Sequence, residues 1–213
     1  MRSDLDPACQ PVYEAARRFE EVALRRDGSL FEPDRSVWSA GVLDDLHARF
    51  VLAPDPSSDS FEEKLRRQLT GAPAATIQLA AELLFVHFLV AHDIGEVTKR
   101  HLVDLVRSWC AEPISVPADL ELAFATGVCS TGIAFKTYRP LQLYFLIDFM
   151  RAWKELAGSE RDRLLKDAWE FKDFAESIPQ KAAFTQRQGF VHLLFPHTFE
   201  DMVSRDQKAL IIK

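Results

Sequence analysis

The chain has 213 residues, 47% of them hydrophobic and 27% charged, which is enough to bury the core of one large domain or two small ones. Its formal net charge of −6 argues against a generally basic nucleic-acid coat, although it leaves room for a local basic face. Its three cysteines, Cys9, Cys110 and Cys129, are odd in number and far apart. This usage predicts free thiols in a reducing cytoplasm rather than a disulfide framework.

The first half of the chain shows helical periodicity between short loops. Apolar residues at helical spacing predict helices over residues 11–26 and 39–50. Ser60 and Glu63 form a capping-box pattern, which indicates that a helix begins there and runs over residues 61–69. Residues 73–91 and 96–110 have the composition of two further helices.

The apolar segment 73–91 approaches the length of a membrane span. It is interrupted by Thr76, Gln78, Glu82 and His87. A carboxylate at the centre of a spanning helix costs about 3 kcal/mol on insertion scales, and no basic flank compensates here. The segment therefore predicts the buried central helix of a soluble bundle, with no membrane partner.

The second half of the chain continues the helical pattern. Gly127 suits a left-handed position after a short helix, and Pro140 suits the first turn of a long one. Ser159 and Asp162 predict the start of a helical region that runs to about residue 177, and a last helix ends at Phe195. Strand signals are nearly absent. The sequence predicts an all-α fold with about nine or ten helices in a single domain over residues 1–197, followed by a junction segment over 198–213.

Catalytic signatures are missing from the sequence. Residues 127–134 have the two-glycine spacing of a phosphate-binding loop but lack the Lys-Ser/Thr that must follow, so we expect the chain neither to bind nor to hydrolyse ATP or GTP. The histidine pairs have the wrong spacing for metal ligands on one helix, and no serine nucleophile elbow occurs. We expect a fragment that is not an enzyme and holds no metal and no cofactor.

Most basic residues have an acidic neighbour one helical turn earlier. Such pairs support solvated helices by about 0.3–0.5 kcal/mol each. The predicted pairs are Glu21 with Arg25, Glu62 with Arg66, Glu63 with Arg67, Glu96 with Arg100, and Asp162 with Lys166.

The loop before Pro140 is less paired and admits two interpretations. In the first, Lys136, Tyr138 and Arg139 bind nucleic acid by phosphate contact and base stacking at a helix N-terminus. Lys99 and Arg100 complete this set of candidate nucleic-acid-binding residues. In the second, Phe135 and Tyr138 anchor the loop to the core, while Arg139 pairs with a buried acid such as Glu82.

The aromatic segment 169–174 also admits two interpretations. Trp169, Phe171 and Phe174 could line a groove for a peptide. Their helix-neighbour spacing favours packing into the core instead.

Three blocks of sequence resemble one known family. They are residues 60–69 (SFEEKLRRQL), 78–83 (QLAAEL) and 192–208, which begins HLLFPHTFE and ends SRDQK. Together they resemble the region that precedes the motor module in methylcytosine-restriction-type (McrB-like) AAA+ NTPases. The residues assigned structural or junction roles are Glu82, Phe195, Pro196, Phe199 and Glu200.

The resemblance implies a setting rather than a chemistry. It implies a non-catalytic targeting or specificity domain of a bacterial anti-phage system, with DNA or another infection cue as its candidate ligand. A downstream AAA+ domain and a nuclease subunit are the implied partners. The familiar modified-base readers of that family are β-rich, so base flipping is not expected of a helical domain. The alternative is a protein-interaction or regulatory module that docks a partner protein or the motor domain.

Overall fold

The computed structural model describes residues 5–180 and 182–204, and within these ranges the regular elements are helical. The first half of the chain forms η1 (Pro7–Cys9), α1 (Gln10–Phe19), η2 (Glu20–Leu24), α2 (Ala40–Leu46), η3 (His47–Val51), α3 (Phe61–Gln68) and α4 (Ala74–Val90). The second half forms α5 (Glu96–Arg107), α6 (Ala118–Glu121), η4 (Leu122–Ala125), α7 (Gly132–Thr137), α8 (Arg139–Glu155), α9 (Gly158–Leu164), α10 (Ala168–Ser177) and α11 (Phe184–Leu194). The all-α prediction is confirmed.

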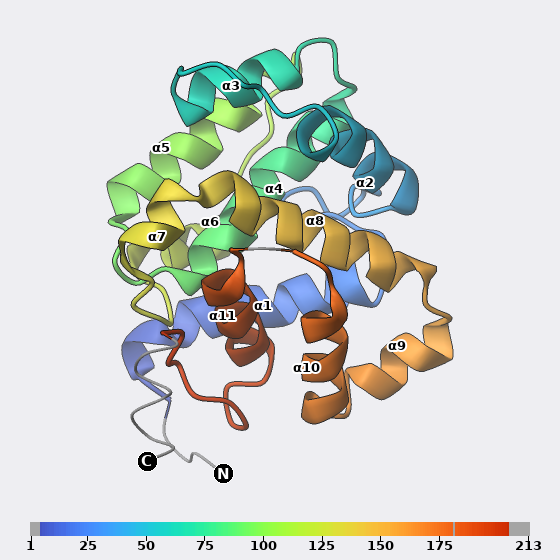
Figure 1. Cartoon of the computed structure of the whole chain (residues 1–213), viewed down its shortest axis with the longest axis vertical. Coiled ribbons are helices and arrows are strands. Elements are labelled where there is room, and N and C mark those ends of the chain that lie inside the picture. Colours follow the sequence, from blue (N-terminus) through green and yellow to red (C-terminus); the bar gives the residue numbers. More distant parts are fainter. Residues whose placement is uncertain (1–4, 181, 205–213) are drawn as a thin grey trace.

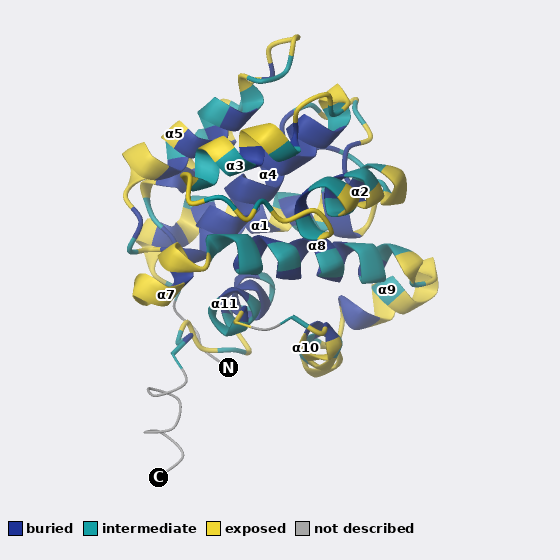
Figure 2. Ribbon diagram, turned by 45° about the horizontal axis from the view of Figure 1, so that its top comes forward, coloured by how far each residue is buried: buried dark blue, intermediate teal, exposed yellow. Residues whose placement is uncertain are grey.

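Helix α4 is the centre of the molecule. It is buried on all sides from Thr76 to Val90, as the dark blue ribbon in Figure 2 shows. Helices α1, α2, α5, α8 and α11 pack around it (Figure 1). A helix that is apolar all round needs such a shell, because every face must be covered. No helix in the described ranges has the length and apolar character needed to cross a membrane.

Glu82 attaches the segment between η2 and α2 to this central helix. Its fully buried carboxylate accepts hydrogen bonds from the indole of Trp38 at 2.7 Å and from the backbone amide of Leu30 at 2.9 Å. Three more donors reach the same carboxylate, from Ser29, Phe31 and Gln78. Burial raises the pKa of Glu82, and these hydrogen bonds act in the opposite direction.

An aromatic cluster joins α8, α10 and α11. Phe149 stacks on Trp153 at 5.7 Å between ring centroids, and it meets Phe171 at 5.6 Å and Phe190 at 5.0 Å. Phe174 packs edge-on against Phe149 at 5.4 Å. The core-packing interpretation of the 169–174 segment is therefore confirmed for Phe171 and Phe174.

Helix boundaries differ from the sequence prediction in the region of residues 159–177. The helical region expected from Ser159 to residue 177 is two helices, because α9 begins at Gly158 and Asp167 caps α10 through the amides of Trp169 and Glu170. The capping box of Ser60 and Glu63 is confirmed at the start of α3.

Gly127 does not take the left-handed conformation that its position suggested. It is needed for close approach instead. A Cβ atom on Gly127 would lie 2.3 Å from the carbonyl carbon of Ala91. Beside it, the segment 128–129 hydrogen-bonds to the last residues of α4, with Cys129 N donating to Val90 O at 2.8 Å.

The predicted helix ion pairs are partly confirmed. Glu96 pairs with Arg100 at 2.9 Å, and Glu21 lies 3.9 Å from Arg25. Two others are replaced by contacts that the sequence did not predict. Arg67 pairs with Asp55 and Asp59, each at 2.8 Å, and Asp162 pairs with Arg25 at 3.2 Å.

Candidate functional site

A cleft of about 500 Å³ lies between α3, with the loop before it, and the corner where α7 leads into α8. Figure 2 brings α3, α7 and α8 to the viewer's side of the molecule. The side of α3 contributes Phe50, Pro54, Asp55, Asp59, Phe61, Lys64 and Gln68. The side of α8 contributes Lys136, Thr137, Tyr138, Arg139, Pro140, Leu141 and Tyr144. We call this the Arg139 cleft.

Arg139 is the most unusual residue of the cleft. Its guanidinium lies over the rings of Phe61 and Phe88, 5.3 Å and 5.6 Å from their centroids. It makes no hydrogen bond or ion pair within residues 5–180 and 182–204, and its buried Nε lacks a partner there. Burial lowers the pKa of Arg139, while nearby Glu62 raises it. The expected pairing with Glu82 is wrong, because the donors from Ser29 to Trp38 surround that carboxylate.

The other residues of the 134–140 loop divide between the two interpretations. Phe135 is fully buried and stacks on His87 at 4.4 Å, so it anchors α7 to α4 as the packing interpretation predicted. Tyr138 is 52% exposed and therefore does not anchor the loop. Its ring is available at the mouth of the cleft, beside Arg139 at the first turn of α8.

Lys136 and Asp93 join this corner to the end of α4. Lys136 Nζ donates to the carbonyl of Asp93 at 2.7 Å and lies 3.6 Å from its carboxylate. That carboxylate also accepts hydrogen bonds from the amides of Thr131 and Gly132, both at 2.9 Å. Burial alone would raise the pKa of Asp93, but these hydrogen bonds lower it to about 2. The amides that a phosphate would need in this glycine loop already bind Asp93.

Lys99 and Arg100 do not line the Arg139 cleft. Lys99 is completely buried, where it donates to the carbonyl of Thr126, and burial lowers its pKa to about 8. Arg100 pairs with Glu96 at 2.9 Å and Glu121 at 3.3 Å. Of the five predicted nucleic-acid-binding residues, the structure brings together Lys136, Tyr138 and Arg139.

The sequence analysis did not predict the wall of the cleft on the side of α3. Arg67 folds the loop of residues 54–59 back onto α3 by its ion pairs with Asp55 and Asp59. Phe50 packs edge-on against Tyr144 at 5.0 Å and closes the floor. Lys64 forms no ion pair with another described residue. These contacts join residues that are 8 to 94 positions apart in the sequence, so helical periodicity does not predict them.

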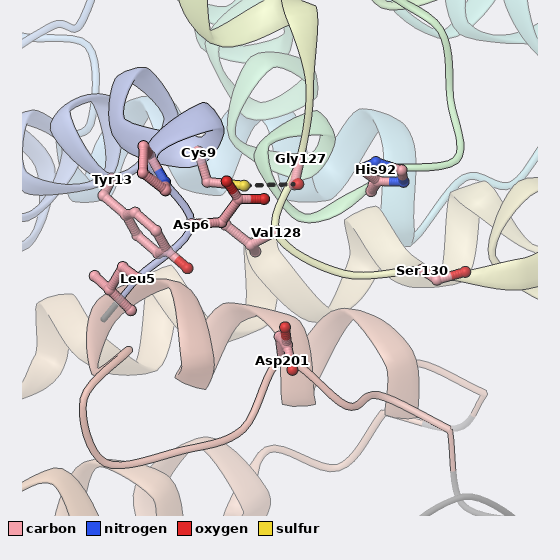
Figure 3. A pocket seen from close by; sticks show the side chains of 10 residues that line it. Leu5, Asp6, Cys9, Tyr13, His92, Gly127, Val128, Ser130 and Asp201 are labelled. Carbon is pink, nitrogen blue, oxygen red and sulfur yellow. Dashed lines mark hydrogen bonds between the residues drawn. The ribbon is translucent and has the colours of Figure 1, made fainter. Parts of the chain in front are cut away.

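A second cavity of about 540 Å³ lies near the start of α1. Figure 3 shows Cys9, Tyr13, Asp6 and Asp201 around it. The Cys9 thiol donates to the carbonyl of Gly127 at 3.5 Å, and burial together with Asp6 and Asp201 raises its pKa. A thiol held in this way stays protonated at neutral pH, so it is a poor nucleophile.

The junction residues fold back onto the helical body. His192 Nδ1 donates to the carbonyl of Phe199 at 2.8 Å, and the hydroxyl of Tyr13 donates to Nε2 of the same ring at 3.0 Å. Phe195 packs against Phe171 at 5.1 Å, and Phe199 meets Trp169 edge-on at 5.1 Å. Trp169 itself is 62% exposed, so the core-packing interpretation is wrong for this residue. Pro196 and Glu200 lie in the same turn, and the predicted segment after Ser204 falls outside the described residues.

In the described ranges, no three histidine, cysteine or acidic side chains gather as metal ligands would. Comparison with known proteins adds no relative, since no family model, curated protein or solved structure matches this chain.

Proposed function

We propose that this chain is a non-catalytic recognition domain that binds an anionic ligand in the Arg139 cleft. The observation that supports this most is the half-buried guanidinium of Arg139, which has no acceptor among the described residues. Buried polar groups in folded proteins are almost always hydrogen-bonded, and an exception of this kind calls for a specific reason. An anion that enters the cleft would supply the missing acceptors.

The energetics favour a ligand over an accidental gap. A hydrogen bond to a charged group contributes roughly 1.5–3 kcal/mol, whereas a buried donor left without a partner costs about 1–3 kcal/mol. The rings of Phe61 and Phe88 offset part of that cost through cation–π contact, worth about 0.5–2 kcal/mol. The guanidinium is thus held in place by aromatic rings, and Arg139 remains part of the cleft lining.

The setting that we propose is the targeting end of a McrB-like anti-phage AAA+ NTPase. The sequence blocks at 60–69, 78–83 and 192–208 support it. In this proposal the domain acts in the cytoplasm, senses an infection cue such as DNA, and passes the signal to a downstream motor domain and a nuclease subunit. The charge pattern favours a compact ligand over a long duplex, because many cations already bind carboxylates of the chain.

Anion-dependent thermal stability tests this function. Inorganic phosphate, titrated against chloride at constant ionic strength, should raise the melting temperature of the protein, because a ligand that binds only the folded state stabilises it. Arg139→Gln should abolish that rise. The control is Arg17→Gln, since Arg17 is an exposed arginine 3.9 Å from Glu14. An equal rise in the wild type and in Arg139→Gln would contradict the proposal.

The alternative function, docking of a partner protein, has one specific observation in its favour. Trp169 is 62% exposed and is held edge-on by Phe199. Tryptophan is enriched among the residues that dominate protein interfaces. Trp169→Ser should weaken association with the downstream motor domain if this alternative is right, and should leave phosphate binding in the Arg139 cleft unchanged.

A further inference from the structure

We propose that the ligand of the Arg139 cleft is a single nucleotide with an unpaired base, and this inference rests on the proposed function. Nine of the fourteen lining residues belong to three chemical groups: cations, aromatic rings and carboxylates. A nucleotide offers one complementary part to each of them. A simple anion uses the first group alone.

The cations form the phosphate end of the cleft. Arg139 presents unused guanidinium donors, and planar guanidinium groups match phosphate oxygens with two parallel hydrogen bonds. Lys64 lies in the same lining without an ion pair to another described residue. Arg139 also begins α8, a helix of 17 residues, whose N-terminal dipole adds to the attraction for an anion.

The aromatic rings form a surface on which a base can stack. Tyr138 is 52% exposed at the mouth, while Phe61 and Tyr144 line the interior. Burial raises the pKa of Tyr144, so its phenol stays neutral and can act as donor as well as acceptor. An exposed aromatic beside a phosphate-binding cation is a recurrent arrangement in proteins that bind single-stranded nucleic acid.

The carboxylates distinguish a nucleotide from a longer polyanion. Asp55 and Asp59 line the cleft opposite α8 and are fixed there by Arg67. Their remaining lone pairs can accept hydrogen bonds from the exocyclic amine of adenine, guanine or cytosine. They would repel a second or third phosphate. The lining therefore suits a ligand with one anionic end and one hydrogen-donating ring.

A duplex does not fit this division of the lining. The faces of its bases are stacked on their neighbours, and their Watson–Crick amines are paired, so neither Tyr138 nor Asp59 would find its partner. A free mononucleotide and an unpaired nucleotide of a single strand share the required chemistry. Binding experiments can separate these two sources.

Isothermal titration with a series of ligands tests the inference. AMP should bind roughly 5- to 150-fold more tightly than ribose 5-phosphate, because stacking of the base adds to the phosphate contact. ATP should bind no more tightly than AMP. A short oligoadenylate that binds more tightly than AMP identifies a single strand as the source, and equal affinity identifies the free nucleotide. The duplex of the same oligomer should not compete.

Variants separate the two ends of the ligand. Tyr138→Ala should weaken AMP binding to the level of ribose 5-phosphate and leave phosphate binding unchanged, and Asp59→Asn should weaken AMP binding alone. Arg139→Gln should weaken AMP and phosphate alike by about tenfold or more, with Arg139→Lys intermediate. Arg17→Gln is again the control. Circular dichroism confirms that each variant is folded.

The failures of the two proposals differ. Equal affinity for AMP and ribose 5-phosphate, with both dependent on Arg139, would overturn the nucleotide assignment and leave the anion site standing. If a short acidic peptide binds through Arg139 and AMP does not, the nucleotide assignment is also overturned, while the anion site stands. If no anion binds in a manner that depends on Arg139, the proposed function and the inference both fall.

Discussion

Glu82, within α4, and Arg139, whose guanidinium lies over Phe88 of α4, differ in how the fold satisfies them. Glu82 is completely buried and accepts five hydrogen bonds, whereas Arg139 is half-buried and makes none with the described residues. The first arrangement is that of a structural anchor, because every donor comes from the chain itself. The second leaves a buried donor without an acceptor beside a cavity, which is what we expect of a binding residue. The sequence identified both residues but paired them with each other.

Replacement of Glu82 tests the role of the anchor. Glu82→Gln keeps the size of the side chain but turns an amide towards donors from Leu30 and Trp38, so that at least one buried donor loses its partner. We expect a loss of about 1–3 kcal/mol in the free energy of unfolding, measured by urea denaturation. An unchanged unfolding midpoint would show that the carboxylate does not hold the 29–38 segment.

Lys99 gives a prediction on pH dependence. Burial lowers its pKa from 10.5 to about 8. Between these values the unfolded chain binds more protons than the folded one, so the contribution of Lys99 to stability rises with pH, by up to roughly 3 kcal/mol. The unfolding free energy of the wild type should therefore rise relative to that of Lys99→Met as the pH increases from 8 to 10.5. Lys166→Met, at an exposed lysine, is the control for the loss of one surface charge.

At the scale of the element, the sequence was informative where local patterns decide the structure. The capping box at Ser60 and the predominantly apolar composition of 73–91 are local signals, and both gave the right helices. Glycine is needed at position 127 because the backbone of Ala91, 36 positions away in the sequence, approaches it closely. The local helix-ending pattern suggested a left-handed conformation instead, which Gly127 does not adopt. The wall of the Arg139 cleft formed by α3 likewise depends on contacts between residues that are far apart in the sequence.

A pair of glycine variants tests the close approach. Gly127→Ala should destabilise the fold by about 1–3 kcal/mol, since its Cβ would overlap the Ala91 backbone and force a shift. Gly41→Ala is the matched control, because no atom lies within 4 Å of the added methyl group and the site is inside α2. That control should gain about 0.5–1 kcal/mol. Equal stability of the two variants would rule out the close-approach explanation.

At the scale of the whole molecule, the fold brings two distant segments to one cleft. The α3 region and the α7–α8 corner are separated in sequence by α4, α5, α6 and η4, yet both line the Arg139 cleft. Half of the site was predictable, since Tyr138 and Arg139 stand out as a weakly paired loop before a proline. The other half depends on how α3 packs, which periodicity alone does not specify.

The measurement that tests the central proposal most directly is the nuclear magnetic resonance signal of the Arg139 side chain. In ¹⁵N-labelled protein, the Nε–H resonance of Arg139, assigned by its loss in Arg139→Lys, reports on an acceptor that approaches the guanidinium. Titration with phosphate and with AMP should shift this resonance in a saturable way and leave that of Arg17 unchanged. If the Arg139 resonance stays in place while either ligand binds elsewhere, the cleft is not the anion site.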